Sequence, residues 1–365
     1  MRVLIAPQEF KGSLSSDEAA LAIRQGLRQS RPEWTFDILP MSDGGPGFLE
    51  ALRKAVKADT AATVVHDALG RPVLGRWLRV RDSGEIVIEA AQANGLFHLR
   101  ADELDPLHAD TAGVGELIAE AAREGPSRIV VGVGGSATTD GGAGMARALG
   151  ARFRGEDGTE LPPGGAPLAG LARIDWQPPE WVGRIEVVVA TDVTNPLTGP
   201  DGAAATYAPQ KGADAAQVEL LEAALLRYGA VLNRSLGVAV GGIPGGGAAG
   251  GLAAGLVAFL GARIESGFDL VARTTHLRER MATCDLVVTG EGSFDSQSLQ
   301  GKVTGRIVEM ATELGKPVVV FAGRAESAAA NVRTLMAIAP DPGTAMREAD
   351  PLLSRLAAEW AAEHP

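Results

Sequence analysis

The 365-residue sequence predicts an α/β protein in which a discontinuous parallel-sheet domain carries an inserted mixed α/β domain. Three observations support this fold class. Short runs of Val, Ile and Leu end in glycine-rich or polar turns and lead into alanine-rich segments with helical periodicity, as in βα units. Only 4% of the residues are aromatic and 47 residues are glycine, which suits closely packed layers joined by tight turns. The length favours two domains over one.

Seven apolar segments are the expected strands of the βα units. They are 2–6, 35–39, 128–133, 185–190, 285–289, 317–322 and 334–338. Between residues 60 and 90 the pattern changes to successive strands with turns at 69–70 and 82–84, which predicts a meander. A shorter hairpin is expected over 151–161, and a loop over 162–170.

The order of these segments predicts the domain organisation. The first two strands and the last three are expected to form one five-stranded domain from residues 1–60 and 262–365. Residues 61–261, which contain the meander, are expected to form the inserted mixed domain.

Composition excludes several classes of partner. The net charge of −11 and the absence of a long Lys/Arg cluster argue against nucleic acid, whose binding requires many neutralised phosphates. Cys284 is the only cysteine, so no intramolecular disulfide can form and a reducing cytoplasm is the expected location. The amino-terminal apolar run is too short for a signal peptide. The nearly uncharged stretch 250–262 is too short to cross a bilayer, so no membrane partner is expected.

Polar and glycine residues gather after the predicted strands, where open α/β sheets bind ligands. After the first strand, Lys11 and several backbone N–H groups are expected at a helix amino terminus, which attracts anions. The alternative is that Ser13 or Ser15 caps this helix and Lys11 lies in solvent.

The second strand leads into an Asp-Gly-Gly turn. Asp43 could bind Mg²⁺ or a substrate hydroxyl there, and Gly44 and Gly45 would allow close approach of the backbone to a ligand. The alternative is a turn without a ligand.

The strongest local signal is the glycine-rich segment 132–144, which follows a clear strand and precedes a helix. The backbone N–H groups of Gly134 and Gly135, with the hydroxyls of Ser136 and Thr138, could surround a phosphate. A tight turn without a ligand is the alternative.

The segment after 185–190 places Asp192 at a strand end, near Asn195. These side chains could hold a metal or a substrate hydroxyl, or form an Asx-turn before Pro196. A further glycine-rich segment, 241–251, leads into another predicted helix.

The last polar segment, 289–302, follows a buried strand and contains Gly290, Glu291, Asp295 and Lys302. Two carboxylates and a lysine in one loop suit metal-assisted phosphoryl transfer. Solvated surface charge is the alternative for each of them.

The absence of two known motifs excludes further classes of reaction. The sequence has no G-x-x-x-x-G-K-[ST] loop and no G-x-S-x-G motif, and its five histidines lie outside the segments above. The chemical groups left in the glycine-rich and polar segments are carboxylates, lysines, backbone N–H groups and hydroxyls. Phosphoryl transfer depends on such groups.

Together these motifs closely resemble the bacterial glycerate kinases. APQEFKGSLS, SDGGPG, GVGGSATTDGGAGM, DVTNPLTGP, YAPQKGA, PGGGAAGGLAAGL, SGFDLV, VTGEGSFDSQSLQGK and PVVVFAG occur in the family's order over nearly the whole chain. The family commonly has Asp-Ser in place of Gln8-Glu9, Glu in place of Pro46 and Asn in place of Thr139. We interpret these departures as natural variation.

The resemblance implies a flavodoxin-like domain with an inserted mixed domain, and an active site in the cleft between them. It implies transfer of a phosphoryl group from ATP, with Mg²⁺, to a hydroxyl of D-glycerate, usually the 2-hydroxyl. Lys11 and Lys302 would neutralise phosphate or carboxylate charge, and Lys211 is a weaker candidate. Asp192 and Asp295 are the candidate base and Mg²⁺ ligand, in either assignment. A homodimer is a further expectation.

Two alternatives remain at this stage. Gly132, Gly134 and Ala137 match a dinucleotide fingerprint, and Glu156 lies near the position of a ribose-binding acid, which would suit an NAD-dependent oxidoreductase. The chain could also be a non-catalytic protein that binds glycerate or phosphate, with turnover lost through the changes at Gln8 and Pro46.

Overall fold

The computed structural model describes residues 1–295, 302–326 and 331–364. The chain forms two compact units. Unit 1 consists of Met1–Val56 and Phe268–Pro365, and unit 2 of Lys57–Gly267. The domain boundaries expected after residues 60 and 261, and a site shared by the two units, stay predictions.

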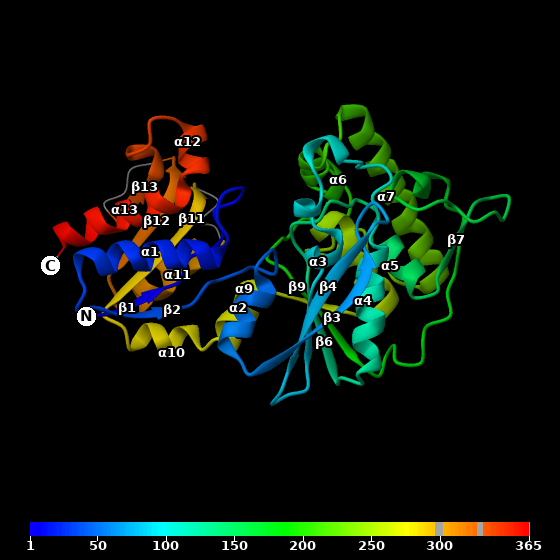
Figure 1. Cartoon of the computed structure of the whole chain (residues 1–365). Coiled ribbons are helices and arrows are strands. Elements are labelled where there is room, and N and C mark those ends of the chain that lie inside the picture. Colours follow the sequence, from blue (N-terminus) through cyan, green and yellow to red (C-terminus); the bar gives the residue numbers. More distant parts are fainter. Residues whose placement is uncertain (296–301, 327–330, 365) are drawn as a thin grey trace. The chain divides into compact units, whose positions relative to one another are not determined.

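Unit 1 contains a five-stranded parallel sheet in the order β13-β12-β11-β1-β2 (Figure 1). Numbered within the unit, this order is 2-1-3-4-5 from the β2 edge, which is the flavodoxin-like arrangement. From β1 the chain continues to β2 on one side, and the later strands β11, β12 and β13 are added on the other side of β1. The topological switch point therefore lies between β1 and β11. Its strands are β1 (Arg2–Ile5), β2 (Thr35–Ile38), β11 (Leu286–Phe294), β12 (Val318–Ala325) and β13 (Val332–Thr334).

Two long helices of unit 1 pack against each other and supply much of its core. A Cβ atom added to Gly26 in α1 would lie 1.9 Å from the carbonyl oxygen of Ser354 in α13, so glycine is needed at this contact. The buried faces of α1 and α13 pack with apolar residues of β1, β11 and β12. The helices are α1 (Ser16–Ser30), α2 (Phe48–Ala55), α9 (Gly267–Thr274), α10 (Leu277–Ala282), α11 (Val303–Glu313), η6 (Leu335–Ala337), α12 (Pro342–Arg347) and α13 (Ala349–Glu363).

Unit 2 contains a six-stranded mixed sheet in the order β10-β9-β6-β5-β4-β3. The first four strands in this order are parallel, and β5, β4 and β3 form the predicted antiparallel meander. The fold class is therefore confirmed as a split parallel-sheet unit with a mixed α/β insertion. The strands are β3 (Ala58–His66), β4 (Pro72–Val80), β5 (Ile86–Glu89), β6 (Arg128–Gly132), β9 (Glu186–Ala190) and β10 (Arg263–Glu265).

Helices α3, α4 and α8 of unit 2 pack on this sheet, and α5, α6 and α7 share its apolar core. The longest, α7, begins with a capping box in which the Asp214 side chain accepts from Gln217 N. The helices are α3 (Ala91–Asn94), η1 (Leu96–His98), η2 (Ala101–Glu103), α4 (Ala112–Arg123), α5 (Ala143–Ala148), η3 (Ala166–Gly170), α6 (Ala203–Tyr207), η4 (Pro209–Lys211), α7 (Ala215–Leu236), η5 (Ala248–Gly251) and α8 (Leu252–Leu260).

Two local predictions differ from the structure. The strand expected over 334–338 lies earlier: β13 ends at Thr334, and the Leu-Met-Ala run that follows forms η6. Valine and threonine favour strands more than these three residues do, and the turn buries Leu335 in the core. The hairpin over 151–161 is only partly correct. β7 (Arg152–Arg154) makes one bridge across that turn but pairs along its length with the distant β8 (Arg173–Asp175).

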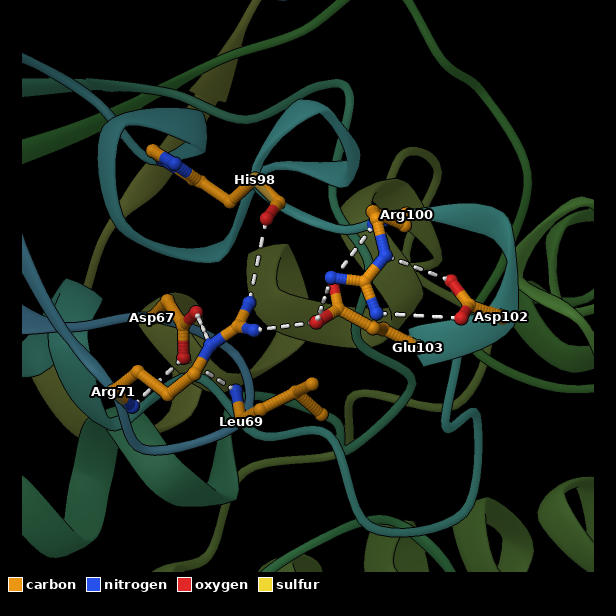
Figure 2. Close-up of polar contacts among 7 residues, drawn as sticks. All are labelled: Asp67, Leu69, Arg71, His98, Arg100, Asp102 and Glu103. Atoms are coloured by element: carbon orange, nitrogen blue, oxygen red, sulfur yellow. Dashed lines mark hydrogen bonds and ion pairs between the residues drawn. The ribbon is translucent and has the colours of Figure 1, made fainter.

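The turn between β3 and β4 is fixed by a buried carboxylate (Figure 2). Asp67 Oδ1 accepts from the backbone N–H groups of Leu69 and Arg71, each at 2.9 Å. Arg71 donates through Nε to Asp67 Oδ2 at 2.6 Å and through Nη1 to Glu103 at 2.9 Å. The same arginine thus ties the meander to η2. Burial acts to raise the pKa of Asp67, but the hydrogen bonds from Arg71 and Leu69 outweigh it and lower the pKa.

Within the described ranges, no helix combines the length and apolar character needed to span a membrane.

Candidate active site

In unit 1, Gln8 links the segments that follow β1 and β2 to the middle of β11. Its backbone N–H donates to Gly290 O at 2.8 Å, and its Nε2 donates to Asp43 Oδ2 at 3.2 Å. Asp43 Oδ1 accepts from Gly45 N at 3.1 Å, and Gly44 has a φ of +98°. The Asp-Gly-Gly segment is therefore a turn that holds a half-buried carboxylate beside the first strand. Gln8 supports that carboxylate.

Lys11 does not lie at the amino terminus of α1 as expected. Phe10 and Leu14 exchange backbone hydrogen bonds of 2.8 and 3.0 Å, so Lys11 lies in a separate exposed turn. The helix begins later because Ser15 and Glu18 form its capping box. The sequence alternative, a serine cap with Lys11 in solvent, describes this helix correctly. Lys11 nevertheless lines a pocket with the ends of β11 and β12.

Three of the predicted charged residues lie in the second half of β11 or in the segment that follows it. Glu291 is buried within the strand, with 6% of its surface exposed. Asp295 follows the strand and forms an ion pair with Lys302 at 3.7 Å. A Cβ atom on Gly290 would lie 2.2 Å from the carbonyl oxygen of Phe321 in β12, so this glycine serves strand packing. Residues 296–301, which belong to the same predicted segment, lie outside the described residues.

In unit 2, the glycine-rich segment after β6 turns its hydroxyl groups into the protein. Ser136 and Thr138 are both buried. Ser136 Oγ accepts from Lys211 Nζ at 3.1 Å, and Thr138 Oγ1 accepts from Asn94 Nδ2 at 3.1 Å. Gly134 and Gly135 remain partly exposed, so the backbone is the part of this loop that is accessible to a ligand.

Lys211 is the central support of this loop. It is only 2% exposed, and its Nζ also donates to the carbonyl oxygen of Thr138. Burial lowers the pKa of Lys211 to about 7, and the nearby Asp140 carboxylate partly opposes that shift. The sequence marks Lys211 only weakly, because its partners lie more than 70 residues earlier.

Asp140 fixes the other end of the loop. Its fully buried carboxylate accepts from Thr111 N at 3.0 Å, Thr111 Oγ1 at 2.8 Å, Gly142 N at 3.1 Å and Gly144 N at 2.8 Å. Burial, with the neighbouring Asp140 charge, raises the pKa of Asp110 to about 6. The sequence analysis did not select Asp140. Its position in a Thr-Thr-Asp-Gly-Gly run was the one available signal.

Asp192 and Asn195 follow β9 and differ in their surroundings. Asp192 is half-buried at the strand end, and its Oδ1 accepts from Ser266 Oγ at 2.7 Å. Asn195 instead closes its own loop: Nδ2 donates to Asp201 O at 2.7 Å, and Oδ1 accepts from Tyr207 at 2.8 Å. Asp192 therefore remains a chemical candidate, whereas the Asn195 amide is engaged in structural contacts.

The second glycine-rich segment packs against both loops. Gly245 N donates to Thr194 O at 3.1 Å, and Gly141 N donates to Gly250 O at 3.0 Å. Gly250 has a φ of +66°, and a Cβ atom there would lie 2.0 Å from Thr138 O. These glycines thus permit close contact between segments far apart in the sequence.

The geometry does not match the dinucleotide fingerprint. In such sites the helix amino terminus meets the pyrophosphate directly after the first glycines. Here α5 begins at Ala143, well after Gly134, and has only six residues. Glu156, the candidate ribose ligand, is 82% exposed and pairs with Arg227 at 3.0 Å.

Comparison with known proteins decides the family. The family model described as the glycerate kinase family matches residues 3–363. The chain belongs to the glycerate kinase family.

Named members of this family are similar along most of their length. A protein named glycerate 2-kinase from Escherichia coli K12 is 42% identical over 324 residues, which is 88% of this chain and 85% of that protein. A glycerate kinase from Halalkalibacterium halodurans is 38% identical over 322 residues, with the same coverage of 88% and 85%. The crystal structure of a putative glycerate kinase 2 from Salmonella typhimurium LT2 superposes with a TM-score of 0.79 at 39% identity, covering 100% of this chain and 98% of that one.

Proposed function

We propose that this protein is a phosphotransferase that moves a phosphoryl group from ATP to D-glycerate and forms 2-phosphoglycerate. The match of the glycerate kinase family to residues 3–363 carries this proposal, together with relatives named glycerate kinase and glycerate 2-kinase. The acids and lysines at the strand ends of both units support it. A cytoplasmic location and a homodimer stay predictions.

Phosphoryl transfer needs charge neutralisation more than covalent chemistry by the protein. We assign this role in unit 1 to Lys11 and Lys302, whose ammonium groups reach solvent. In unit 2, the partly exposed backbone of Gly134 and Gly135 would contact phosphate oxygens. Ser136 and Thr138, both buried, would act by holding that backbone in place.

The residues present suit Mg²⁺ bound together with ATP. Such an ion needs only one or two protein carboxylates, because phosphate oxygens and waters complete its coordination. Within the described ranges, no three or more His, Cys, Asp or Glu side chains gather in an arrangement able to hold a metal. Asp295 or Asp192 would hold the Mg²⁺ ion, and the ion would neutralise phosphate charge.

The remaining aspartate would accept the proton of the glycerate hydroxyl. Asp192 has one carboxylate oxygen fixed by Ser266, and Asp295 is close to the Lys302 ammonium. Asn variants of each separate the two roles. Loss of the Mg²⁺ ligand should raise the Mg²⁺ concentration needed for half-maximal rate. Loss of the base should leave that concentration unchanged and flatten the acidic limb of the pH–rate profile.

A coupled assay of ADP formation tests the proposal. We expect ADP only when ATP, Mg²⁺ and D-glycerate are all present, with L-glycerate as the matched control substrate. ADP release at the same rate without D-glycerate would show that glycerate is not the acceptor.

A further inference from the structure

A pocket of about 400 Å³ lies within unit 1, at the carboxyl ends of β11 and β12. Its remaining walls come from the turn after β1, from η6 and from α12. Figure 1 shows α12 beside the ends of β12 and β13. The pocket adjoins the switch point between β1 and β11, which is where doubly wound sheets bind nucleotides and related ligands.

The interior of the pocket is apolar, and flexible methionine side chains lie at its rim. Phe10, Leu335 and Ala345 line it with exposed fractions of 1%, 2% and 6%. Met336 and Met346 also line it but are 37% and 52% exposed. The flexible thioethers of these methionines can pack against a flat ring.

The polar side chains of the pocket are cationic or neutral. Lys11 and Arg324 line it and are both exposed. Arg324 Nε donates to Ser293 Oγ at 3.1 Å, which holds the guanidinium beside the strand end. None of the described residues that line the pocket is acidic. An apolar interior with cations beside it is complementary to a ligand that has a flat apolar part and a charged anionic part.

We propose that this pocket binds the adenosine end of ATP, with the base against Phe10 and Leu335 and the phosphates near Lys11 and Arg324. This inference rests on the proposed function, which supplies the nucleotide. A volume of about 400 Å³ lies in the range of roughly 300–1,000 Å³ found for small-molecule sites. Glycerate is much smaller, and its hydroxyls would lack partners on an apolar surface.

The kinetic test adds one negative charge at the rim. Met346→Glu should raise the KM for ATP at least about tenfold, because the carboxylate repels the nucleotide and removes apolar contact. The KM for D-glycerate at saturating ATP should not change. Leu21→Glu is the matched control, since Leu21 is 39% exposed in the same unit but does not line the pocket. An active Met346→Glu enzyme with the wild-type KM for ATP would overturn the pocket assignment.

Photolabelling tests the pocket without requiring turnover. Irradiation with 8-azido-ATP should label the tryptic peptide 334–347, which contains both rim methionines. Excess ATP should prevent this labelling. Labelling confined to peptides of residues 57–267 would overturn the inference, even in a protein with full kinase activity. Labelling of peptide 334–347 in a protein without glycerate-dependent turnover would instead support the pocket and contradict the proposed function.

Discussion

The buried ammonium of Lys211 should make the stability of unit 2 increase with pH. In the folded protein the pKa of Lys211 is about 7, whereas an unfolded lysine titrates near pH 10.4. Between these values the unfolded chain binds a proton that the folded chain does not. The free energy of unfolding must therefore rise with pH in this window. A neutral amine can still donate to Ser136 and Thr138, so the loop contacts survive the titration.

Lys211→Met removes the titration and keeps most of the side-chain volume. The difference in unfolding free energy between wild type and this variant should shift in favour of the wild type by about 2 kcal/mol from pH 7 to pH 9. Urea unfolding followed by tryptophan fluorescence measures it, because Trp77, Trp176 and Trp181 lie in unit 2. Lys57→Met, which removes an exposed ammonium, is the control for loss of one charge. A difference that stays constant from pH 7 to pH 9 would refute the reasoning.

Three further perturbations test other contacts of the two units. Gly250→Ala should lower the free energy of unfolding by at least roughly 2 kcal/mol in urea unfolding, since its Cβ would meet a loop carbonyl at 2.0 Å. Gly261→Ala shares the positive φ (+64°) but has open space, so a similar loss there would contradict the packing argument. Asp67→Asn should lower the thermal unfolding midpoint at pH 7. Because the folded pKa of Asp67 is lowered, that deficit should shrink below about pH 4, and a pH-independent deficit would contradict it. Asp295→Asn should reduce kcat by roughly 10²-fold or more with an unchanged melting temperature. A near-normal kcat in the coupled assay would leave Asp192 as the better candidate.

Local sequence patterns were sufficient for most of the fold. Four of the five strands of unit 1 are short, mainly apolar runs bounded by turn residues, so hydrophobic periodicity and turn residues locate them without knowledge of their partners. The meander was predicted equally well, because the turns at residues 69–70 and 82–84 join strands that are adjacent in the sequence. The β7–β8 pairing was not, since Arg152–Arg154 and Arg173–Asp175 meet across 18 intervening residues and neither strand is long enough to give a pattern.

The sequence located candidate residues along the chain but not the direction of their side chains. Asp192 follows β9 of unit 2 and Asp295 follows β11 of unit 1, as expected from the predicted strands, and their roles stay predictions. The sequence could not show that the hydroxyls of Ser136 and Thr138 point inward, because this depends on Asn94 and Lys211, which lie far away in the sequence. It left Lys11 either at the helix amino terminus or in solvent, because the turn that precedes α1 is closed by backbone hydrogen bonds between Phe10 and Leu14.

The most direct test of the central claim is an enolase-linked measurement of the product. Purified protein, ATP, Mg²⁺, D-glycerate and excess enolase are mixed, and the absorbance of phosphoenolpyruvate is followed at about 240 nm, alongside ADP. Enolase dehydrates 2-phosphoglycerate and not 3-phosphoglycerate. We predict one phosphoenolpyruvate for each ADP as the reaction begins, with neither product formed when D-glycerate is omitted. ADP formation that depends on glycerate but yields no phosphoenolpyruvate would contradict phosphorylation at the 2-hydroxyl, and ADP formation that does not depend on glycerate would contradict the kinase itself.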